Sequence, residues 1–159
     1  MTPPEISEKL KTHFADAVLE AKLDGVPDPY LKILPGRMLA VAEFLHDETD
    51  LQFNFLMCLS GVDYGKGMLG IVYHLFSMTK RHKMTIKVDL PSDKPVVPSV
   101  VPVWPSANWH EREAYDMFGI MFTGHPDLRR ILLPDDYPGH PLRKDFKVPE
   151  FYQGMKVPY

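Results

Sequence analysis

The sequence predicts an α+β fold, in which helices pack on a small mixed or antiparallel sheet and an extended, irregular C-terminal segment follows. Three observations support this prediction. Apolar residues recur at helical spacing near the N-terminus, two central segments have the character of paired strands, and many of the 16 prolines fall after residue 90. Because proline lacks an N–H and fixes φ, the second half of the chain is not expected to form long regular elements.

The first expected element is an amphipathic helix over residues 6–23. Its apolar positions recur at helical spacing: Ile6, Leu10, Phe14, Ala17, Val18 and Ala21. Asp24-Gly25 and Pro27 follow it and are typical of a helix end.

Short elements are expected between residues 30 and 59. Two strands, at residues 30–34 and 38–41, would flank a turn at Pro35-Gly36. Two helical stretches, at residues 43–47 and 51–59, would follow, and the second is strongly apolar.

The clearest strands are residues 68–78 and 83–90, joined by a loop at 79–82 of a length suited to a hairpin. The second strand alternates strictly between polar and apolar residues, which predicts one buried face. The polar face, which we expect to meet water or another subunit, consists of Lys83, Thr85, Lys87 and Asp89.

The last predicted helix covers residues 109–118. Asn108, with Glu111 three residues later, matches a capping box, and Gly119 stands where helices commonly end. Beyond residue 122 no periodicity is found, yet the segment holds too many apolar side chains to leave in water. We therefore expect a globular domain at residues 1–122 and an extended partner-binding segment at 123–159.

Composition excludes several classes of function. A net charge of −3 and a pI near 6.1 argue against a general nucleic-acid binder. The single cysteine, Cys58, cannot form an internal disulfide or by itself hold an iron–sulfur cluster, and its apolar surroundings predict a small buried side chain. No apolar run approaches the ~20 residues of a membrane span, and the N-terminus resembles neither a secretory signal nor a transit peptide. These features predict a reducing, cytoplasm-like compartment.

The charged helix at residues 109–118 allows two interpretations. A catalytic one makes Glu113 or Asp116 a general base with His110 as its proton partner. A structural one makes Glu111, Arg112, Glu113 and Asp116 a network that fixes the helix and meets a partner, with Arg112 and Asp116 close enough to pair. We favour the structural one, because the segment contains no activated nucleophile and no phosphate-binding loop.

Two near-repeats follow, each with Gly-His-Pro and then a pair of basic residues. The first spans residues 124–130 and the second spans residues 139–145. His125 and His140 could ligate a metal, although no cysteine lies nearby. The basic residues could instead hold carboxylates of a partner, or satisfy backbone carbonyls of their own segment; residue types leave these two possibilities open. The basic residues are Arg129, Arg130, Arg143 and Lys144.

These segments together resemble the core motifs of the 30-kDa (C-type) subunit family of the proton-pumping NADH:quinone oxidoreductase, respiratory complex I. The resemblance is carried by Trp104-Pro105-Ser106-Ala107-Asn108-Trp109, Glu111-Arg112-Glu113-Ala114-Tyr115-Asp116-Met117-Phe118-Gly119-Ile120, Gly124-His125-Pro126-Asp127-Leu128-Arg129-Arg130 and Gly139-His140-Pro141-Leu142-Arg143-Lys144-Asp145-Phe146. The N-terminal half matches only in outline. Lys147 departs from the family, which usually has proline after the final Asp-aromatic pair.

The resemblance implies a peripheral-arm subunit without a cofactor of its own, since FMN and the iron–sulfur clusters lie in partner subunits. It implies that the C-terminal segment lies against the 49-kDa (D-type) subunit, which helps form the quinone site, with B- and I-type subunits nearby. It also implies a peripheral position on the cytoplasmic face of the inner membrane in a bacterium. Catalytic, cofactor-binding and metal-binding residues are not expected. The expected interface residues are Glu111, Arg112, Glu113, Asp116, His125, Arg129, Arg130, His140, Arg143, Lys144 and Asp145.

Two alternatives remain. Membrane-bound nickel-iron hydrogenases and deazaflavin-dependent dehydrogenases use similar subunits, so the chain could serve a sibling complex. A stand-alone acid–base enzyme built on His110, Glu113 and Asp116 is the less favoured alternative.

Overall fold

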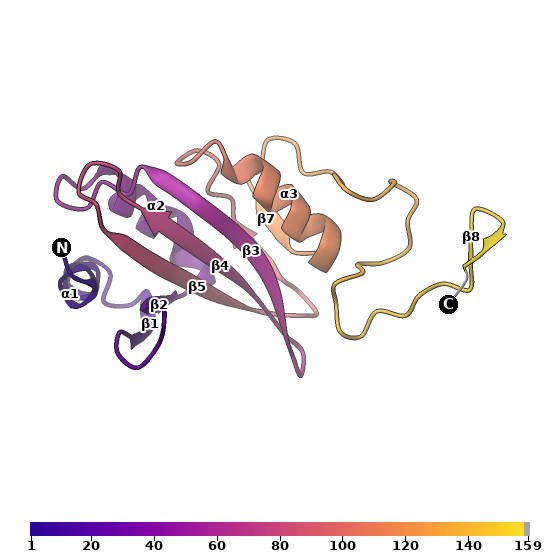
Figure 1. The fold of residues 1–159 in the computed structure, drawn as a ribbon, viewed down its shortest axis with the longest axis horizontal. Coiled ribbons are helices and arrows are strands. Elements are labelled where there is room, and N and C mark those ends of the chain that lie inside the picture. Colours follow the sequence, from indigo (N-terminus) through magenta and orange to yellow (C-terminus); the bar gives the residue numbers. More distant parts are fainter. Residues whose placement is uncertain (158–159) are drawn as a thin grey trace.

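A five-stranded mixed sheet forms the centre of the structure, a computed structural model that describes residues 1–157 (Figure 1). The strand order is β1-β2-β5-β4-β3, with β2 and β5 parallel and the other neighbours antiparallel. The strands are β1 (Val18–Lys22), β2 (Tyr30–Ile33), β3 (Phe55–Gly65), β4 (Met68–Phe76) and β5 (Lys83–Pro91). The predicted α+β class is therefore confirmed.

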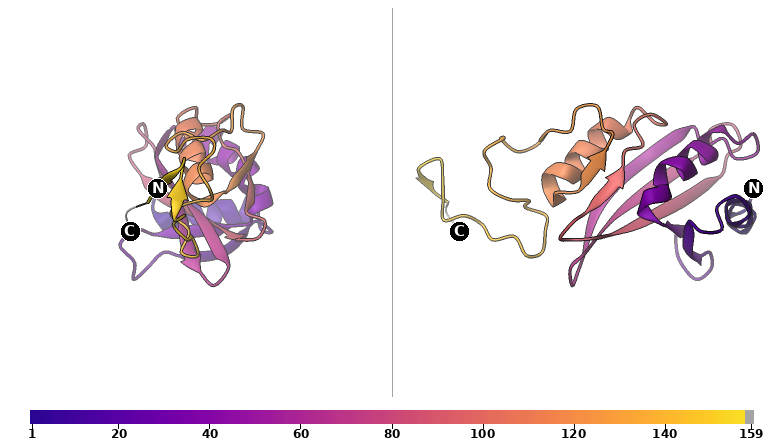
Figure 2. Two further views of the ribbon diagram at one scale, coloured as in Figure 1. Left: turned by 90° about the vertical axis from the view of Figure 1, so that its right-hand side faces the viewer. Right: turned by 180° about the vertical axis from the view of Figure 1, so that it is seen from behind.

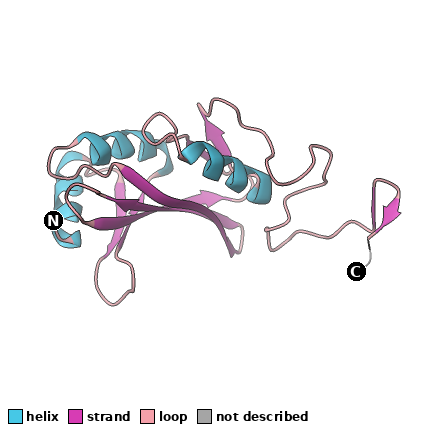
Figure 3. Ribbon diagram, turned by 45° about the horizontal axis from the view of Figure 1, so that its top comes forward, coloured by secondary structure: helices cyan, strands magenta, loops and turns pink. Residues whose placement is uncertain are grey.

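Helices cover one face of this sheet. They are α1 (Pro3–His13), α2 (Met38–Asp47), which follows a 3-10 turn, η1 (Pro35–Arg37), and α3 (Ala107–Phe118). Figure 3 shows α2 and α3 on the same side of the sheet, while the described residues place no helix on the opposite face. Short pairs complete the fold: β6 (Val96–Pro98) runs parallel to β7 (Met121–Thr123), and β8 (Phe151–Tyr152) pairs with β9 (Met155–Lys156).

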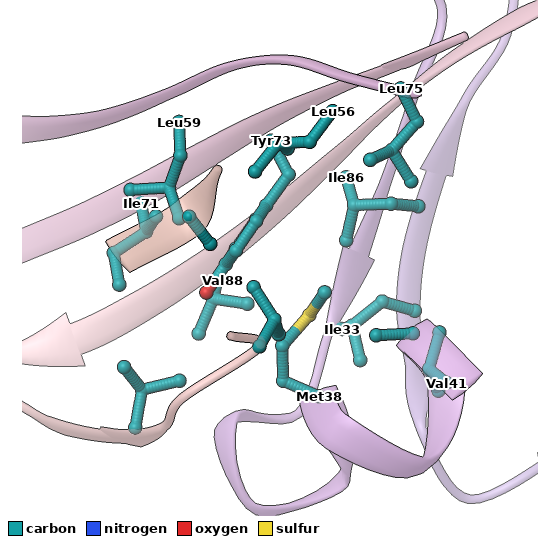
Figure 4. Close-up of a cluster of buried hydrophobic side chains, with 14 of the residues drawn as sticks. Ile33, Met38, Val41, Leu56, Leu59, Ile71, Tyr73, Leu75, Ile86 and Val88 are labelled. Carbon is teal, nitrogen blue, oxygen red and sulfur yellow. The ribbon is translucent and has the colours of Figure 1, made fainter. Parts of the chain in front are cut away.

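The hydrophobic core lies between the sheet and α2. Alternate residues of β4 and β5 point toward this helix, as does Ile33 of β2 (Figure 4). Burying each such aliphatic side chain stabilises the fold by about 1.5–3 kcal/mol relative to exposure. The core residues labelled in the figure include Met38, Val41, Leu56, Leu59, Ile71, Tyr73, Leu75, Ile86 and Val88, all of them almost completely buried.

The predicted strands at 68–78 and 83–90 are confirmed as β4 and β5. On the polar face of β5, however, Thr85 is buried, whereas Lys83 is exposed. The helix at 109–118 is confirmed, and Gly119 ends it with a φ of 74°, a left-handed conformation that glycine adopts without steric cost.

The first predicted helix is wrong beyond residue 13. Phe14 N–H donates to the Leu10 carbonyl and closes the helix, and Val18–Lys22 then becomes β1. Pairing with β2 satisfies the backbone of this segment, so tertiary context overrides its helical spacing.

The strand predicted at 38–41 is also wrong, because α2 begins at Met38. Its buried residues Met38, Val41, Ala42 and Leu45 recur at helical spacing. The helix predicted at 43–47 is thus the second half of α2.

The helix predicted at 51–59 is wrong as well, because Phe55 begins strand β3. Leu56 and Leu59 both face the core, three residues apart, because a bulge between Leu56 and Cys58 shifts the register. That spacing imitates a helix. Cys58 is only half-buried rather than buried as expected.

The predicted capping box at Asn108 is wrong too. Ser106 precedes the helix, Asn108 lies inside it, and the Glu111 carboxylate is bound elsewhere.

After β7 the chain leaves the sheet as a long segment without helices. Residues 124–157, called the tail below, extend away at the end opposite the N-terminus (Figures 1 and 2). The tail ends in the β8–β9 hairpin. The division into a domain at 1–122 and a partner-binding segment at 123–159 stays a prediction, and residues 158–159 of that segment lie outside the described residues.

Candidate partner-binding surface

Asp116, in the last turn of α3, organises the first part of the tail. Its Oδ2 accepts the backbone N–H groups of Ile131, Leu132 and Leu133 at 3.1, 2.8 and 2.9 Å, and its Oδ1 pairs with Arg130 Nη1 at 2.9 Å. Burial by itself would raise the pKa of Asp116, but these four donors together hold that pKa below its ordinary value. The carboxylate therefore stays ionised and supplies the hydrogen bonds that an irregular segment cannot form internally.

Arginine side chains satisfy the carbonyls of the same region. Arg112 donates to the carbonyls of Arg129 and Arg130 at 3.3 and 3.2 Å, and Arg130 Nη2 donates to the Gly139 carbonyl at 3.1 Å. Arg112 does not donate to Asp116, although sequence spacing allowed that pair; Arg130 takes this place.

The carbonyls at the end of α3 receive donors from the tail. His140 Nδ1 donates to the Asp116 carbonyl at 2.9 Å, and Arg143 Nε donates to the Phe118 carbonyl at 2.8 Å. The last carbonyls of a helix lack partners within the helix and carry partial negative charge, so basic side chains are favoured there. Gly119 permits the close approach, because a Cβ there would lie 2.6 Å from His140 Nε2. We call these contacts of α3 with residues 129–143 the clamp.

Two further contacts fasten the tail to strand β3 and to the residue that follows β5. Arg143 Nη2 donates to the Ser92 carbonyl at 2.7 Å. Lys144 N–H donates to Asp63 Oδ2 at 2.7 Å, while Asp63 Oδ1 accepts Gly65 N–H at 2.6 Å. These backbone donors lower the pKa of Asp63.

Glu111 of α3 is completely buried and lies near His125, at the start of the tail. Its carboxylate accepts the Ser99 hydroxyl at 2.6 Å and Val100 N–H at 2.8 Å, and burial raises its pKa to about 7. His125 Nε2 lies 4.0 Å from Glu111 Oε2 and 3.2 Å from the Asn108 carbonyl, to which it donates. Asp127 N–H donates to His125 Nδ1 at 3.0 Å, so both ring nitrogens of His125 have a partner in the protein's own backbone.

The structure thus brings most of the predicted interface residues together around α3, where their polar groups bind the protein's own backbone. For Arg130 and Arg143 the contacts are with carbonyls, as the second interpretation of the basic residues proposed. Arg129 pairs with Asp127 at 2.8 Å and is exposed. The exposed predicted residues are Glu113, Arg129, Lys144 and Asp145. The assignment of all eleven to a partner interface stays a prediction.

Apolar side chains exposed along the tail are a second feature of the surface. Phe151 and Met155, in the hairpin, are 61% and 66% exposed. The hairpin is bound to an earlier residue of the tail, because the Tyr152 hydroxyl and the Gln153 amide both donate to Asp136, at 2.9 and 3.2 Å. The other exposed large apolar residues of the tail are Leu132, Leu142 and Val148.

The sequence did not identify three residues that hold this region in place. Ser99 binds Glu111, Asp63 binds the Lys144 N–H, and Asp136 binds Tyr152 and Gln153. Asp63 stands two residues before Gly65, and Asp136 stands two residues before Pro138-Gly139. Nothing in the sequence, however, indicates that Asp63 binds a residue 81 positions away. The partners of such anchors depend on the tertiary path of the chain.

The residues of the acid–base alternative do not converge. His110 and Glu113 line one small cavity, whereas Asp116 points to the clamp. Across residues 1–157, no three His, Cys, Asp or Glu side chains are grouped to hold a metal ion. In the same residues, no helix has the length and apolar character needed to cross a membrane.

Comparison with known proteins shows which family the chain is similar to. The family described as "Respiratory-chain NADH dehydrogenase, 30 Kd subunit" matches residues 31–152. The C-type subunit of the NADH-quinone oxidoreductase of Chlorobium phaeobacteroides is 56% identical over 94% of this chain and 92% of its own length. The same subunit from Chloroherpeton thalassium is 50% identical over 94% of this chain, which spans only 63% of that relative.

Two solved structures share the fold. One is described as Nqo5 of the trypsin-resistant fragment (1-134); it is 29% identical, with a TM-score of 0.62 over 80% of this chain and 100% of its own. The other comes from the membrane-bound sulfane sulfur reductase, an archaeal respiratory membrane complex. It is 25% identical, with a TM-score of 0.74 over 91% of this chain and 85% of its own.

Proposed function

Because the chain belongs to the 30-kDa subunit family of the respiratory-chain NADH dehydrogenase, we propose that it is a non-redox, peripheral-arm subunit of a proton-translocating NADH:quinone oxidoreductase. Its tail docks on the D-type (49-kDa) subunit near the quinone site, with B- and I-type subunits adjacent. The electron carriers, FMN and iron–sulfur clusters, lie in the partner chains. The complex holds this subunit at the cytoplasmic face of the bacterial inner membrane.

The observation that carries the docking proposal is the clamped tail with exposed apolar side chains. An extended segment normally loses conformational entropy when it binds a partner. Here the clamp has already ordered residues 129–143, so less ordering is required on binding. The exposed side chains at Leu142, Phe151 and Met155 then offer apolar area to a partner.

The docking proposal is tested with the double variant Phe151→Asp/Met155→Asp in the assembled complex. Burying two new carboxylates is unfavourable, so we expect the D-type subunit to be lost from affinity-purified material and quinone reduction by membranes to fall. Met78→Asp is the matched control, because Met78 is 62% exposed and lies in the β4–β5 turn, outside the tail. Co-purification of a normal complex with the double variant would refute the docking proposal.

Deleting residues 126–159 is a coarser test, which we expect to abolish assembly. It also removes the partners of Asp116, so the point variants are needed to separate lost docking from a damaged domain.

A sibling complex is the second candidate, favoured by the structural likeness to a chain of the sulfane sulfur reductase. The described residues, 1–157, hold no feature that selects an electron donor. Native purification with mass spectrometry of the co-purifying subunits distinguishes the two: NADH- and flavin-binding chains support the oxidoreductase, and a hydrogenase-like large subunit without them supports the sibling.

A further inference from the structure

A small cavity lies between α3 and the edge strand β3, next to the clamp. It has a volume of about 160 Å³. Ser60 and Gly61 line it from β3, His110 and Glu113 from α3, and Leu142 from the tail. The Phe118 ring packs against the Gly61 backbone, where a Cβ would lie only 2.5 Å from the ring, and so closes one wall.

Glu113 differs from the other carboxylates of α3. Asp116 and Glu111 are buried and accept hydrogen bonds from the protein, whereas Glu113 is exposed at the cavity. Throughout the described chain, none of the ion pairs and side-chain hydrogen bonds of the protein involves Glu113. The cavity therefore carries a negative charge that the chain itself leaves unpaired.

The size and the lining of the cavity fit one long basic side chain. Ala114, Phe118 and Leu142 provide apolar walls against which methylene groups pack, while a carboxylate binds the charged end. Trp109, four residues before Glu113 and 63% exposed, lies on the same stripe of the helix, and exposed tryptophans are common anchors of interfaces.

We propose that this cavity receives an arginine or lysine side chain of the partner subunit, with Glu113 as its counter-ion. Because Leu142 lines the cavity and belongs to the tail, the basic residue comes from the subunit on which the tail docks. The proposal rests on the docking function. It adds the chemistry by which residues 1–123, called the body below, recognise the partner together with the tail.

The test compares Glu113→Gln and Glu113→Lys in the assembled complex. We expect the Gln variant to release its partner at lower salt than the wild type, because the ion pair is lost. The Lys variant should not co-purify with the partner, because two like charges would meet. Glu43→Gln and Glu43→Lys are the matched controls, since Glu43 is also an exposed glutamate on a helix, α2. Wild-type behaviour of both Glu113 variants through the salt series would overturn the proposal.

Filling the cavity provides a second test that changes no charge. Ser60 is exposed, so Ser60→Phe should fold normally while occupying the space, and we expect it to weaken co-purification. Unchanged thermal melting of the isolated variants shows that the fold is intact. If the tail variants lose the partner and the Glu113 and Ser60 variants keep it, this proposal fails and docking by the tail stands; the reverse pattern refutes docking by the tail alone.

Discussion

At the residue scale, Asp116 shows how one buried carboxylate orders a segment without secondary structure. Three consecutive backbone N–H groups, of Ile131, Leu132 and Leu133, converge on one of its oxygens. The segment has no ladder or helix to receive these groups. A single ionised side chain on a rigid helix performs that role instead.

Asp116→Asn should therefore free the start of the tail. The amide presents only one oxygen and no charge to four donors, so we expect a loss of about 3 kcal/mol in unfolding free energy. Trypsin should then cut the isolated variant faster at Arg129 and Arg130. Asp135→Asn, at an exposed carboxylate of the same tail, is the control. Unchanged cleavage at these two arginines would show that Asp116 does not hold the tail.

The raised pKa of Glu111 predicts that the stability of the fold depends on pH. This pKa rises from 4.5 in the unfolded chain to about 7 in the fold, so the folded protein binds more protons than the unfolded one between these values. This contribution is complete below pH 4.5 and is lost as pH rises through 7, a change of about 3 kcal/mol.

Glu111→Gln removes the titrating group but keeps an oxygen for Val100 N–H. We expect the difference in unfolding free energy between wild type and variant to shift in favour of the variant as pH rises from 4.5 to 7. Urea unfolding across this range measures it. A difference that does not change with pH would contradict the assignment.

At the scale of elements, the contact of α3 with β3 depends on a glycine. The Phe118 ring occupies the place of a Cβ at Gly61, so the helix lies close against the edge strand. This approach also brings Glu113 and His110 to the cavity beside β3.

Gly61→Ala should push α3 away from the strand. Overpacking of this kind costs about 1–3 kcal/mol, and chemical denaturation measures it. Gly36→Ala is the matched control, because nothing lies within 4 Å of a Cβ at Gly36 and its φ is not positive. Equal stability of the two variants would show that the helix has room to move without cost.

At the scale of the whole molecule, the body and the tail differ in how they are held. The body buries a continuous core, whereas the tail beyond Lys144 has exposed side chains and a two-residue hairpin pair. Isolated hairpins are only marginally stable, so the distal tail is the part that a partner would stabilise most.

Limited trypsin digestion of the isolated chain should therefore cut first at Lys147, which is exposed, and leave the body and the clamp together. Lys80 and Arg81 are also exposed, but Ser77 holds their turn by hydrogen bonds of 3.1 and 2.8 Å, so cleavage there should be slower. Time-resolved mass spectrometry identifies the order. Initial cleavage in this turn would contradict the prediction, and in the assembled complex Lys147 should be protected.

The sequence by itself determined the α+β class, the β4–β5 hairpin, the end of α3 at Gly119 and the family, because each of these depends on local periodicity, turn chemistry or an ordered run of motifs. It did not determine β1 or β3, whose apolar spacing imitates helices until strand pairing and a bulge are known. Nor did it show which charges bind the protein itself. Asp116 and Glu113 are three residues apart and equally polar in sequence, yet one is buried by the returning tail and the other is left exposed. Only the tertiary path of the chain decides this, because desolvation and hydrogen bonding depend on neighbours that lie far away along the sequence.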